Sequence, residues 1–339
     1  MTSPVSVVAP SPLLGRPGAV AADAPDGAVA AHYGELSGEQ RALAAGRGFV
    51  DLSSRGVVRV TGPDRLSWLH SLTSQHLTEL APGGSTQALV LSPHGHIEHD
   101  LHVVDDGEAT WLGVEPGTAP ALASFLDRMR FLLRVEVADV SADYATLWLP
   151  AAAPVPAGAV VWTPPQDPAD LGEFAGREAL VPRAALAGTG IAGTGIAGTA
   201  AGPPAGILAY EALRIAARVP RLGFETDHRT IPHEIGLLAT AVHLQKGCYR
   251  GQETVARVHN LGRPPRRLVF LHLDGSDSAL PVHGDPVVTE GRTIGFVGSA
   301  GRHHELGPIA LAVIKRNTPR DAELQAGGVP ASAEVVVDA

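Results

Sequence analysis

Twelve consecutive residues near the middle of the chain, from Lys246 to Arg257, carry side chains that could do chemistry. They include Cys248, the only cysteine among the 339 residues. Lys246 and Arg250 flank this cysteine, and nearby positive charge favours the thiolate form of a thiol. We therefore predict that Cys248 is a functional thiol. The alternative is a small buried residue in a glycine-rich turn that leads into a strand.

The same segment offers polar groups that could hold a ligand. Gly247 and Gly251 allow the backbone to turn tightly or to approach another group closely. An amide, a carboxylate and a guanidinium follow, in Gln252, Glu253 and Arg257. The segment is therefore a candidate binding site as well as a candidate catalytic one.

A second set of polar residues recurs at alternate positions further toward the N-terminus. Alternation along an extended strand would place these side chains on one face: His94, His96, Glu98, Asp100 and His102. Three imidazoles and two carboxylates on one face could ligate a metal. The alternative is a polar face turned to solvent or to a ligand cavity. Because no HxxxH or HExxH helix spacing accompanies them, we predict no metal here.

Composition limits the class of protein. The chain has 26 basic and 35 acidic residues and a net charge of −9, which argues against nonspecific binding to nucleic acid or an anionic membrane. One cysteine excludes an intrachain disulfide and a metal cluster held by the cysteines of a single chain. The N-terminus lacks a basic segment before its apolar stretch, and no run of about 18 apolar residues follows. We expect a soluble cytoplasmic protein.

The elements expected around these residues alternate between strands and helices, which is typical of an α+β fold with antiparallel or mixed sheets. Strands are expected at 57–60, 88–91, 97–104, 111–114 and 132–140, and helices at 39–45, 64–72, 119–130 and 207–217. After residue 268 the pattern changes to short strands, which predict a small β-barrel. These strands are expected at 268–273, 286–289, 293–299, 309–314 and 335–337.

The chain should divide into three parts. Residues 1–34 lack periodic patterning and predict a disordered tail. Residues 35–260 form a two-lobed domain, and residues 261–339 form the barrel domain. Inside the second part, 188–200 repeats Gly-Thr-Gly-Ile-Ala, which predicts a flexible insert.

The string Lys-Gly-Cys-Tyr-x-Gly-Gln-Glu-x-x-x-Arg at 246–257 is long and specific. With Pro232-His233-Glu234 before it and Gly262 and Arg267 after it, the string resembles the signature of the YgfZ family. These folate-binding proteins are related to the GcvT aminomethyltransferase of the glycine cleavage system. The similarity runs with gaps from about residue 35 to residue 318. It implies a three-lobed GcvT/YgfZ-like fold with tetrahydrofolate in the central opening and a C-terminal β-barrel.

The resemblance also implies which residues contact folate. They are Arg55, Asp100, Tyr210, Arg214, Lys246, Tyr249, Gln252, Glu253 and Arg257. An extended pterin-aminobenzoyl-glutamate ligand needs a flat apolar contact, amide or carboxylate partners for the pterin edge and cations for the glutamate tail. For Arg214 the alternative is a surface ion pair, for example with Glu211.

The chain departs from the aminomethyltransferases at two places. Those enzymes carry Asp-Asp where this chain has His99-Asp100, and Arg-Leu-Glu where it has Arg214-Ile215-Ala216. A carboxylate near the folate nitrogens would orient or activate the attacking amine. We therefore predict a tetrahydrofolate-binding protein that supports assembly or repair of iron–sulfur enzymes, with Cys248 as the functional thiol. Its expected partners are those enzymes or cluster-assembly proteins. Alternatives are a folate-dependent aminomethyltransferase or demethylase, and a binding module with a structural thiol.

Overall fold

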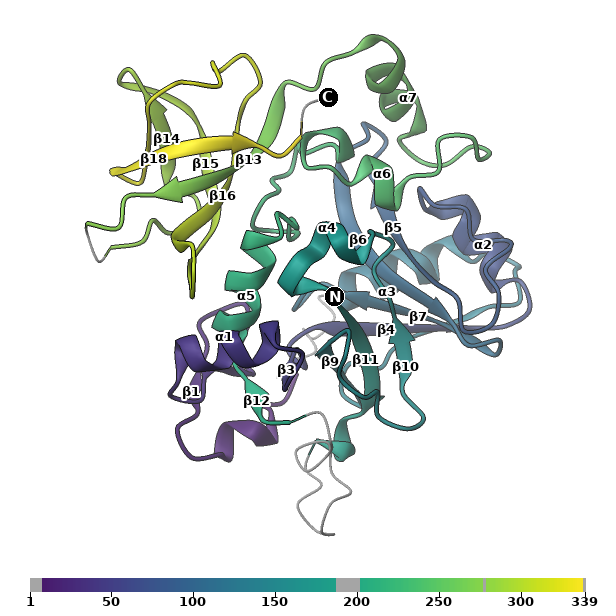
Figure 1. Cartoon of the computed structure of the whole chain (residues 1–339). Coiled ribbons are helices and arrows are strands. Elements are labelled where there is room, and N and C mark those ends of the chain that lie inside the picture. The colour runs from purple at the N-terminus through teal and green to yellow at the C-terminus, as the bar shows by residue number, and fades with distance from the viewer. Residues whose placement is uncertain (1–7, 187–201, 277–278, 338–339) are drawn as a thin grey trace, which may run out of the picture.

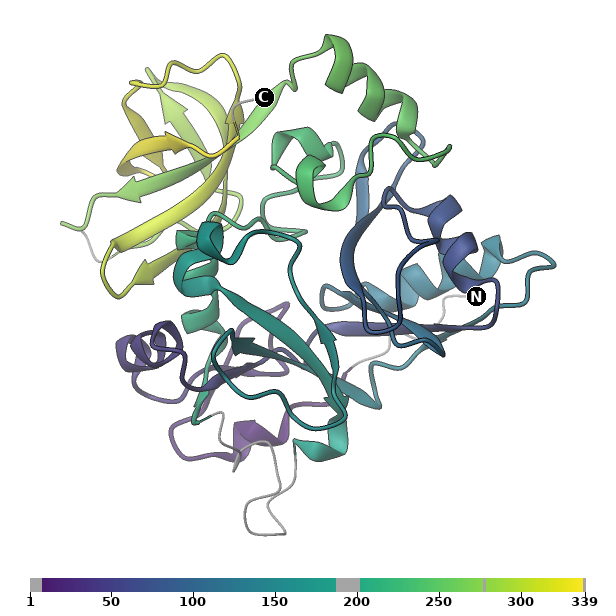
Figure 2. The same cartoon turned by 45° about the vertical axis from the view of Figure 1, so that its right-hand side comes forward.

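The computed structural model describes residues 8–186, 202–276 and 279–337. The predicted insert at 188–200 lies outside the described residues. Two lobes are built around five-stranded sheets and the third is a closed β-barrel (Figures 1 and 2). The predicted α+β class and C-terminal barrel are confirmed.

The first lobe is an antiparallel sheet with helices on one face. In spatial order its strands are β5 (Ser85–Leu91), β6 (Ile97–Asp105), β7 (Ala109–Val114), β4 (Gly56–Thr61) and β8 (Glu136–Asp139). Helices α2 (Arg65–Leu72) and α3 (Ala119–Met129) supply Leu69 and Leu122 to a core that also holds Leu101 and Val103 of β6. Since side chains alternate along a strand, Asp100 and His102 point to the opposite face.

Two sequence-based expectations for this lobe need correction. Strand β6 begins at Ile97, so His94 and His96 lie in the turn before it and are not part of the polar strand face. The strand expected at 132–140 covers only Glu136–Asp139. Leu132 is apolar but fully exposed, because the chain turns sharply after α3 instead of extending into the sheet.

The second lobe has the strand order β10-β11-β9-β3-β12. These strands are β10 (Val160–Trp162), β11 (Gly176–Pro182), β9 (Tyr144–Pro150), β3 (Phe49–Asp51) and β12 (Pro204–Ala205). All neighbours pair antiparallel except β12 and β3, which are parallel. Helices α1 (Leu36–Ala44) and α5 (Ile207–Ala216) bury Leu43 and Leu213 against Val50 and Trp148, and a short α4 (Pro168–Leu171) adds Leu171.

The prediction of a disordered tail is wrong for residues 8–34. A 3₁₀ helix (η1, Pro12–Gly15) precedes strands β1 (Val20–Ala21) and β2 (Ala30–His32), which pair with each other. Leu13 and Val29 are buried in the cores of the second lobe. Single apolar side chains without a period anchor this segment, so periodicity could not reveal it.

The barrel closes in the order β13-β16-β15-β14-β17-β18. Its strands are β13 (Arg266–Leu273), β14 (Pro286–Thr289), β15 (Arg292–His303), β16 (Gly307–Lys315), β17 (Leu324–Ala326) and β18 (Val329–Val335). Val269 and Val297 point inward. Phe270 and Leu311 instead join a core with Ile215 of α5 and Leu89 of β5, so the outer wall of the barrel fastens it to the other lobes.

The segment between the second lobe and the barrel contains α6 (Leu238–Ala241) and α7 (Gln252–Leu261). Besides η1, the described residues form the short 3₁₀ helices η2 (Gly172–Phe174), η3 (Arg183–Ala185) and η5 (Pro232–Glu234). Gly251 precedes α7 in the left-handed conformation, with φ 82°. A Cβ there would lie 2.5 Å from the carbonyl oxygen of Ser92, so only glycine fits. The glycine-rich turn therefore leads into a helix, not a strand.

Among the described residues, no helix combines the length and the apolar character needed to cross a membrane.

Candidate functional site

A hollow of about 50 Å³, partly open to solvent, lies between the two sheets and α5. We call it the central pocket. Its polar lining comes from β5, β6, β11, α5 and the loops beside them, and is Arg55, Gln87, Asp100, His102, Glu115, Gln166, Glu178, Tyr210, Arg214 and Arg221. Its apolar lining is Trp148, Trp162, Pro164, Leu171, Phe174, Val219, Pro220, Leu222 and Leu237.

Arg55 and Tyr210 meet in this pocket, although 155 positions separate them in the chain. Arg55 lies in the turn before β4 and donates from Nη2 to the Tyr210 hydroxyl at 3.1 Å. The Tyr210 ring makes edge contacts with Trp148 and Phe174, at centroid distances of 5.8 and 5.1 Å. Burial raises the pKa of Tyr210 to about 12, so its hydroxyl stays protonated.

Asp100 faces the pocket from β6. Its two carboxylate oxygens accept from Nε2 of Gln87, on the neighbouring strand β5, at 2.9 and 3.0 Å. Burial raises the pKa of Asp100 above the ordinary aspartate value. Cross-strand pairing therefore fixes the direction of this carboxylate, and its desolvation favours the protonated form.

Glu178 of β11 was missed by the sequence analysis. It accepts from Arg55 Nη1 and contacts Nδ1 of His102 at 2.9 Å. Burial opposes its ionisation, but His102 and Arg55 outweigh burial and lower the pKa of Glu178 to about 2. Burial likewise opposes protonation of His102, yet Glu178 and Asp100 raise its pKa above the ordinary histidine value.

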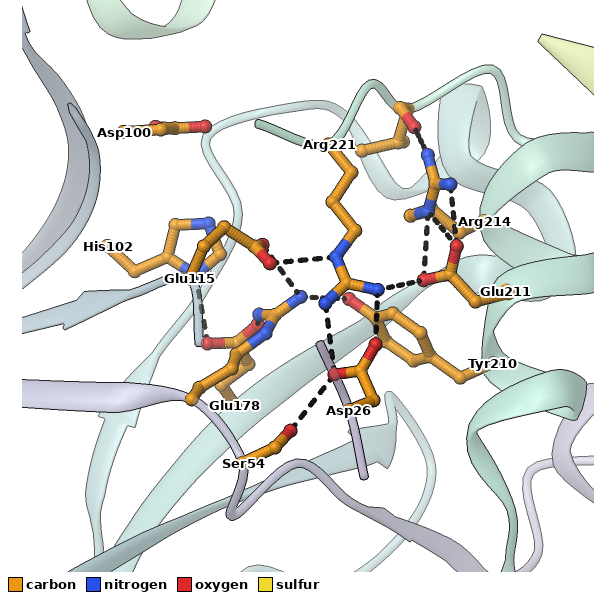
Figure 3. Close-up of polar contacts among 12 residues, drawn as sticks. Asp26, Ser54, Asp100, His102, Glu115, Glu178, Tyr210, Glu211, Arg214 and Arg221 are labelled. Atoms are coloured by element: carbon orange, nitrogen blue, oxygen red, sulfur yellow. Dashed lines mark hydrogen bonds and ion pairs between the residues drawn. The ribbon is translucent and has the colours of Figure 1, made fainter. Parts of the chain in front are cut away.

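Arg221 stands at the centre of a buried ion-pair cluster (Figure 3). It donates to Asp26 at 2.8 and 3.0 Å, to Glu115 at 2.7 Å and to Glu211 at 3.3 Å. These partners come from the N-terminal segment, the end of β7 and α5. Asp26 lies in the segment predicted to be a disordered tail, and no sequence pattern points to Glu115. Their only sequence signal is a lone carboxylate between apolar stretches.

Arg214 is buried at 1% exposure, so the alternative of a surface ion pair is wrong in its placement although its partner Glu211 is right. Its guanidinium donates to Glu211 from Nε and Nη2, to Val219 O and Glu225 from Nη1, and to Ser299 from Nη2. These bonds occupy all five N–H donors of an arginine. Arg214 therefore joins α5 to the barrel and has no donor to spare for a ligand.

The segment around Cys248 does not line the central pocket. The predicted contacts Lys246, Tyr249, Gln252, Glu253 and Arg257 are absent from its lining. Arg250 does reach Glu98, two residues before Asp100 on β6. Tyr249 is buried in the core beside the barrel, whereas Glu253 and Arg257 are exposed on α7. The resemblance predicts one folate site for all these residues, but of Asp100 and the five contacts in 246–257 only Asp100 lines the central pocket.

Cys248 is exposed, and the cations that flank it are engaged elsewhere. Nζ of Lys246 donates to the carbonyl oxygens of His70, Thr73 and Gln75, the last two at 2.6 and 3.1 Å. Arg250 pairs with Glu98 at 2.9 Å. Lys246 thus closes the carbonyl end of α2 and anchors the loop that presents the thiol.

One cluster outside the pocket has the residue types of a metal site. Glu173, His303 and His304 place ligand atoms within 4.8 Å of one another. Nδ1 of His303, however, accepts from the backbone N–H groups of Glu305 and Leu306, both at 3.2 Å. Its Nε2 must then carry the proton and donate to Glu173. Hydrogen bonds satisfy this cluster without an ion.

Comparison with known proteins gives matches at both ends of the chain. Residues 17–154 match the family described as the GCVT N-terminal domain, and residues 266–338 match the glycine cleavage T-protein C-terminal barrel domain. The aminomethyltransferase of Moorella thermoacetica is 28% identical over 315 residues, which cover 84% of this chain and 83% of that protein. The aminomethyltransferase of Geobacillus kaustophilus is 28% identical over 332 residues, which cover 90% of each.

A solved structure shares the fold. It is the crystal structure of glycine cleavage system aminomethyltransferase T from Bartonella henselae, with a TM-score of 0.74 at 19% identity. The match covers 95% of this chain and 94% of that one, so the arrangement of all three lobes is alike.

Proposed function

Because the chain belongs to the GcvT-like aminomethyltransferase superfamily, we propose that it binds a reduced folate, tetrahydrofolate, in the central pocket. The proposal is carried by one observation: a desolvated carboxyl group, Asp100, shares a hollow with the aromatic side chains Trp148, Trp162, Phe174 and Tyr210. The pyrimidinone ring of a reduced pterin is flat and has donors and acceptors along one edge. It therefore suits a carboxyl group set among apolar walls.

Charge in the pocket favours the pterin end of the ligand. The guanidinium groups of Arg55, Arg214 and Arg221 are all paired with carboxylates. An anionic glutamate tail would have to break such pairs to find a cation, and breaking a buried pair is costly. The neutral pterin therefore enters the pocket, and the tail stays on the solvent side.

The activity that the relatives support is folate-dependent aminomethyl transfer. In this function Asp100 lies near the folate nitrogens and orients the amine or the nitrogen that accepts the one-carbon group. Gln87 holds the carboxyl group in place for that task. The replacement of the neighbouring acid by His99 leaves Asp100 as the carboxyl group of that sequence pair that can act.

A second function is favoured by the exposure of Cys248 and by the way Lys246 anchors its loop. In this function the protein is YgfZ-like: it binds tetrahydrofolate and supports assembly or repair of iron–sulfur enzymes through the thiol. Both functions need folate in the pocket, but they differ in the residue that matters. The transferase depends on Asp100, and the iron–sulfur function depends on Cys248.

Two experiments test these proposals. Calorimetry with tetrahydrofolate should show binding to the wild type, weaker binding to Asp100→Asn and unchanged binding to Glu98→Gln. Glu98 is a matched control because it lies on the same strand face but is exposed and paired with Arg250. Absence of binding to the wild type would end the folate proposal.

The second experiment introduces variants into a strain that lacks the gene. Loss of function in Asp100→Asn with full rescue by Cys248→Ser supports the transferase and refutes the iron–sulfur function. The opposite pattern, with lowered activity of cluster-containing enzymes, refutes the transferase. Cys248→Ser is nearly isosteric, so its effect reports on the thiol and not on folding.

A further inference from the structure

His102 is held in the central pocket by two contacts that do not involve a ligand. Its Nδ1 lies 2.9 Å from Oε2 of Glu178, on the other sheet. Its ring stacks on Trp162, with centroids 3.7 Å apart and planes 1° from parallel. One contact fixes the tilt of the imidazole and the other fixes its plane, so the ring has a single orientation.

Within the part of the chain that the structure describes, the hydrogen bond of His102 is made by Nδ1, and the other ring nitrogen, Nε2, makes none. The His102 side chain keeps 20% exposure. It also borders three adjoining hollows, of which the central pocket is one. Asp100 lies two residues earlier on the same strand face, and Figure 3 shows both on the side of the cluster opposite the residues of α5. A rigid imidazole thus presents an unused nitrogen where a ligand would lie.

We propose that Nε2 of His102 donates a hydrogen bond to an acceptor on the ring of the bound folate, with Glu178 and Trp162 as the residues that position it. The inference rests on the proposed folate function and deepens it, because it names the contact that recognises a carbonyl oxygen or ring nitrogen. Nothing in the sequence distinguishes His102 from the four polar residues at alternate positions before it, from 94 to 100. The role of His102 follows from its contact with Glu178 on β11, the strand that faces it.

The charged groups around His102 decide which form of the ring is present. Glu178 approaches from β11, Asp100 from its own strand, and Arg55 and Glu115 from the loops at the ends of β4 and β7. Glu178 and Asp100 favour the imidazolium and Arg55 opposes it. Protonated His102 donates from both nitrogens. When it loses a proton, the remaining hydrogen stays on Nδ1 toward the Glu178 carboxylate, and Nε2 becomes an acceptor.

Affinity for a ligand acceptor should therefore fall as the pH rises through the pKa of His102. We would measure tetrahydrofolate binding by calorimetry from pH 6 to pH 9, under reducing conditions. The wild type should bind on the order of tenfold or more tightly at the acid end, the range expected for a hydrogen bond to a charged group. His102→Phe should bind weakly at every pH. His102→Gln keeps an N–H donor that does not titrate, so its profile should be flat.

Glu178→Gln provides a further test, because its amide oxygen can still accept from Nδ1 without a charge. Its pH profile should keep its shape and move to lower pH. Nuclear magnetic resonance titration of the His102 ring in the ligand-free protein should show the same downward move. His94→Gln is the matched control, since His94 is exposed in the turn before the strand. It should leave both affinity and profile unchanged.

The possible results distinguish the role of His102 from the proposal that the protein binds folate. Failure of the wild type to bind tetrahydrofolate at any pH overturns both. Binding by the wild type with an equal affinity and pH profile in His102→Phe overturns only the role of His102. A flat wild-type profile does the same, because a titrating donor must change the affinity.

Discussion

The cluster around Arg221 allows a test of how the first and second lobes are held around the pocket. Arg221→Met keeps much of the side-chain volume and removes the guanidinium that bonds Asp26, Glu115 and Glu211. Breaking a buried pair by removing one partner typically costs about 3–5 kcal/mol, because a charge is left uncompensated. The structure indicates how the loss is shared among the three carboxylates.

Two of those carboxylates keep another cation. Glu211 retains Arg214 at 2.7 Å, and Glu115 retains Arg55 at 3.6 Å. Among the side chains of the described residues, Asp26 keeps only the hydroxyl of Ser54, at 3.0 Å. One carboxylate is thus left without a cation, and we expect a loss near the lower end, about 3 kcal/mol.

Urea unfolding followed by circular dichroism gives this free energy of unfolding from the midpoint and slope. Arg134→Met is the matched control: its partner is Asp64, its side chain is 74% exposed, and solvent screening should make its loss nearly neutral. Adding Asp26→Asn to Arg221→Met should recover part of the loss, because the uncompensated charge is gone. Equal costs for the two arginine variants, or no recovery in the double variant, would refute the reasoning.

Three further predictions concern single positions. Gly251→Ala should lower the free energy of unfolding by about 1–3 kcal/mol, because the added Cβ meets Ser92 and the φ of Gly251 is positive. Gly247→Ala should be nearly neutral, since nothing lies within 4 Å of the added methyl group, and thermal unfolding compares the two variants. The pKa of Glu178 is lowered from 4.5 to about 2, so the stability that it contributes is present above pH 4.5 and is lost as the pH falls toward 2. Acid unfolding of Glu178→Gln should lack that part of the pH dependence, and a curve identical to the wild type would contradict the ion pairing. Cys248 is exposed, so the native protein should react with one equivalent of a thiol reagent; a reaction that needs denaturant would place the thiol in the interior.

Local patterning was sufficient for most of the regular structure. The alternation of apolar residues at 97–104 predicted β6, and the spacing of Leu122, Phe125 and Met129 predicted α3. These elements each bury one face against a neighbour, which imprints a period of two or 3.6 on the sequence. Where burial lacks a period, as in residues 8–34, the same reasoning failed.

The candidate site was also predicted only in part from the sequence. The sequence pointed to Asp100, Arg55 and Tyr210, and the fold brings all three to one pocket. It also pointed to Lys246, whose ammonium group closes a helix end and does not face that pocket. A run of polar residues indicates that these side chains have polar partners. It does not indicate whether the partner is a ligand or the backbone of the same chain.

By itself, the sequence determined the α+β class and the C-terminal barrel, because these depend on local periodicity. Its composition also singled out the one cysteine, Cys248, as a candidate functional residue. Only the tertiary structure decided that Glu178 meets His102, 76 positions away in the chain, and that Asp26 meets Arg221, 195 positions away. Such pairs depend on which strands and loops face one another across the lobes. That choice is made by the packing of whole apolar faces, and single carboxylates carry no trace of it in their neighbours along the chain.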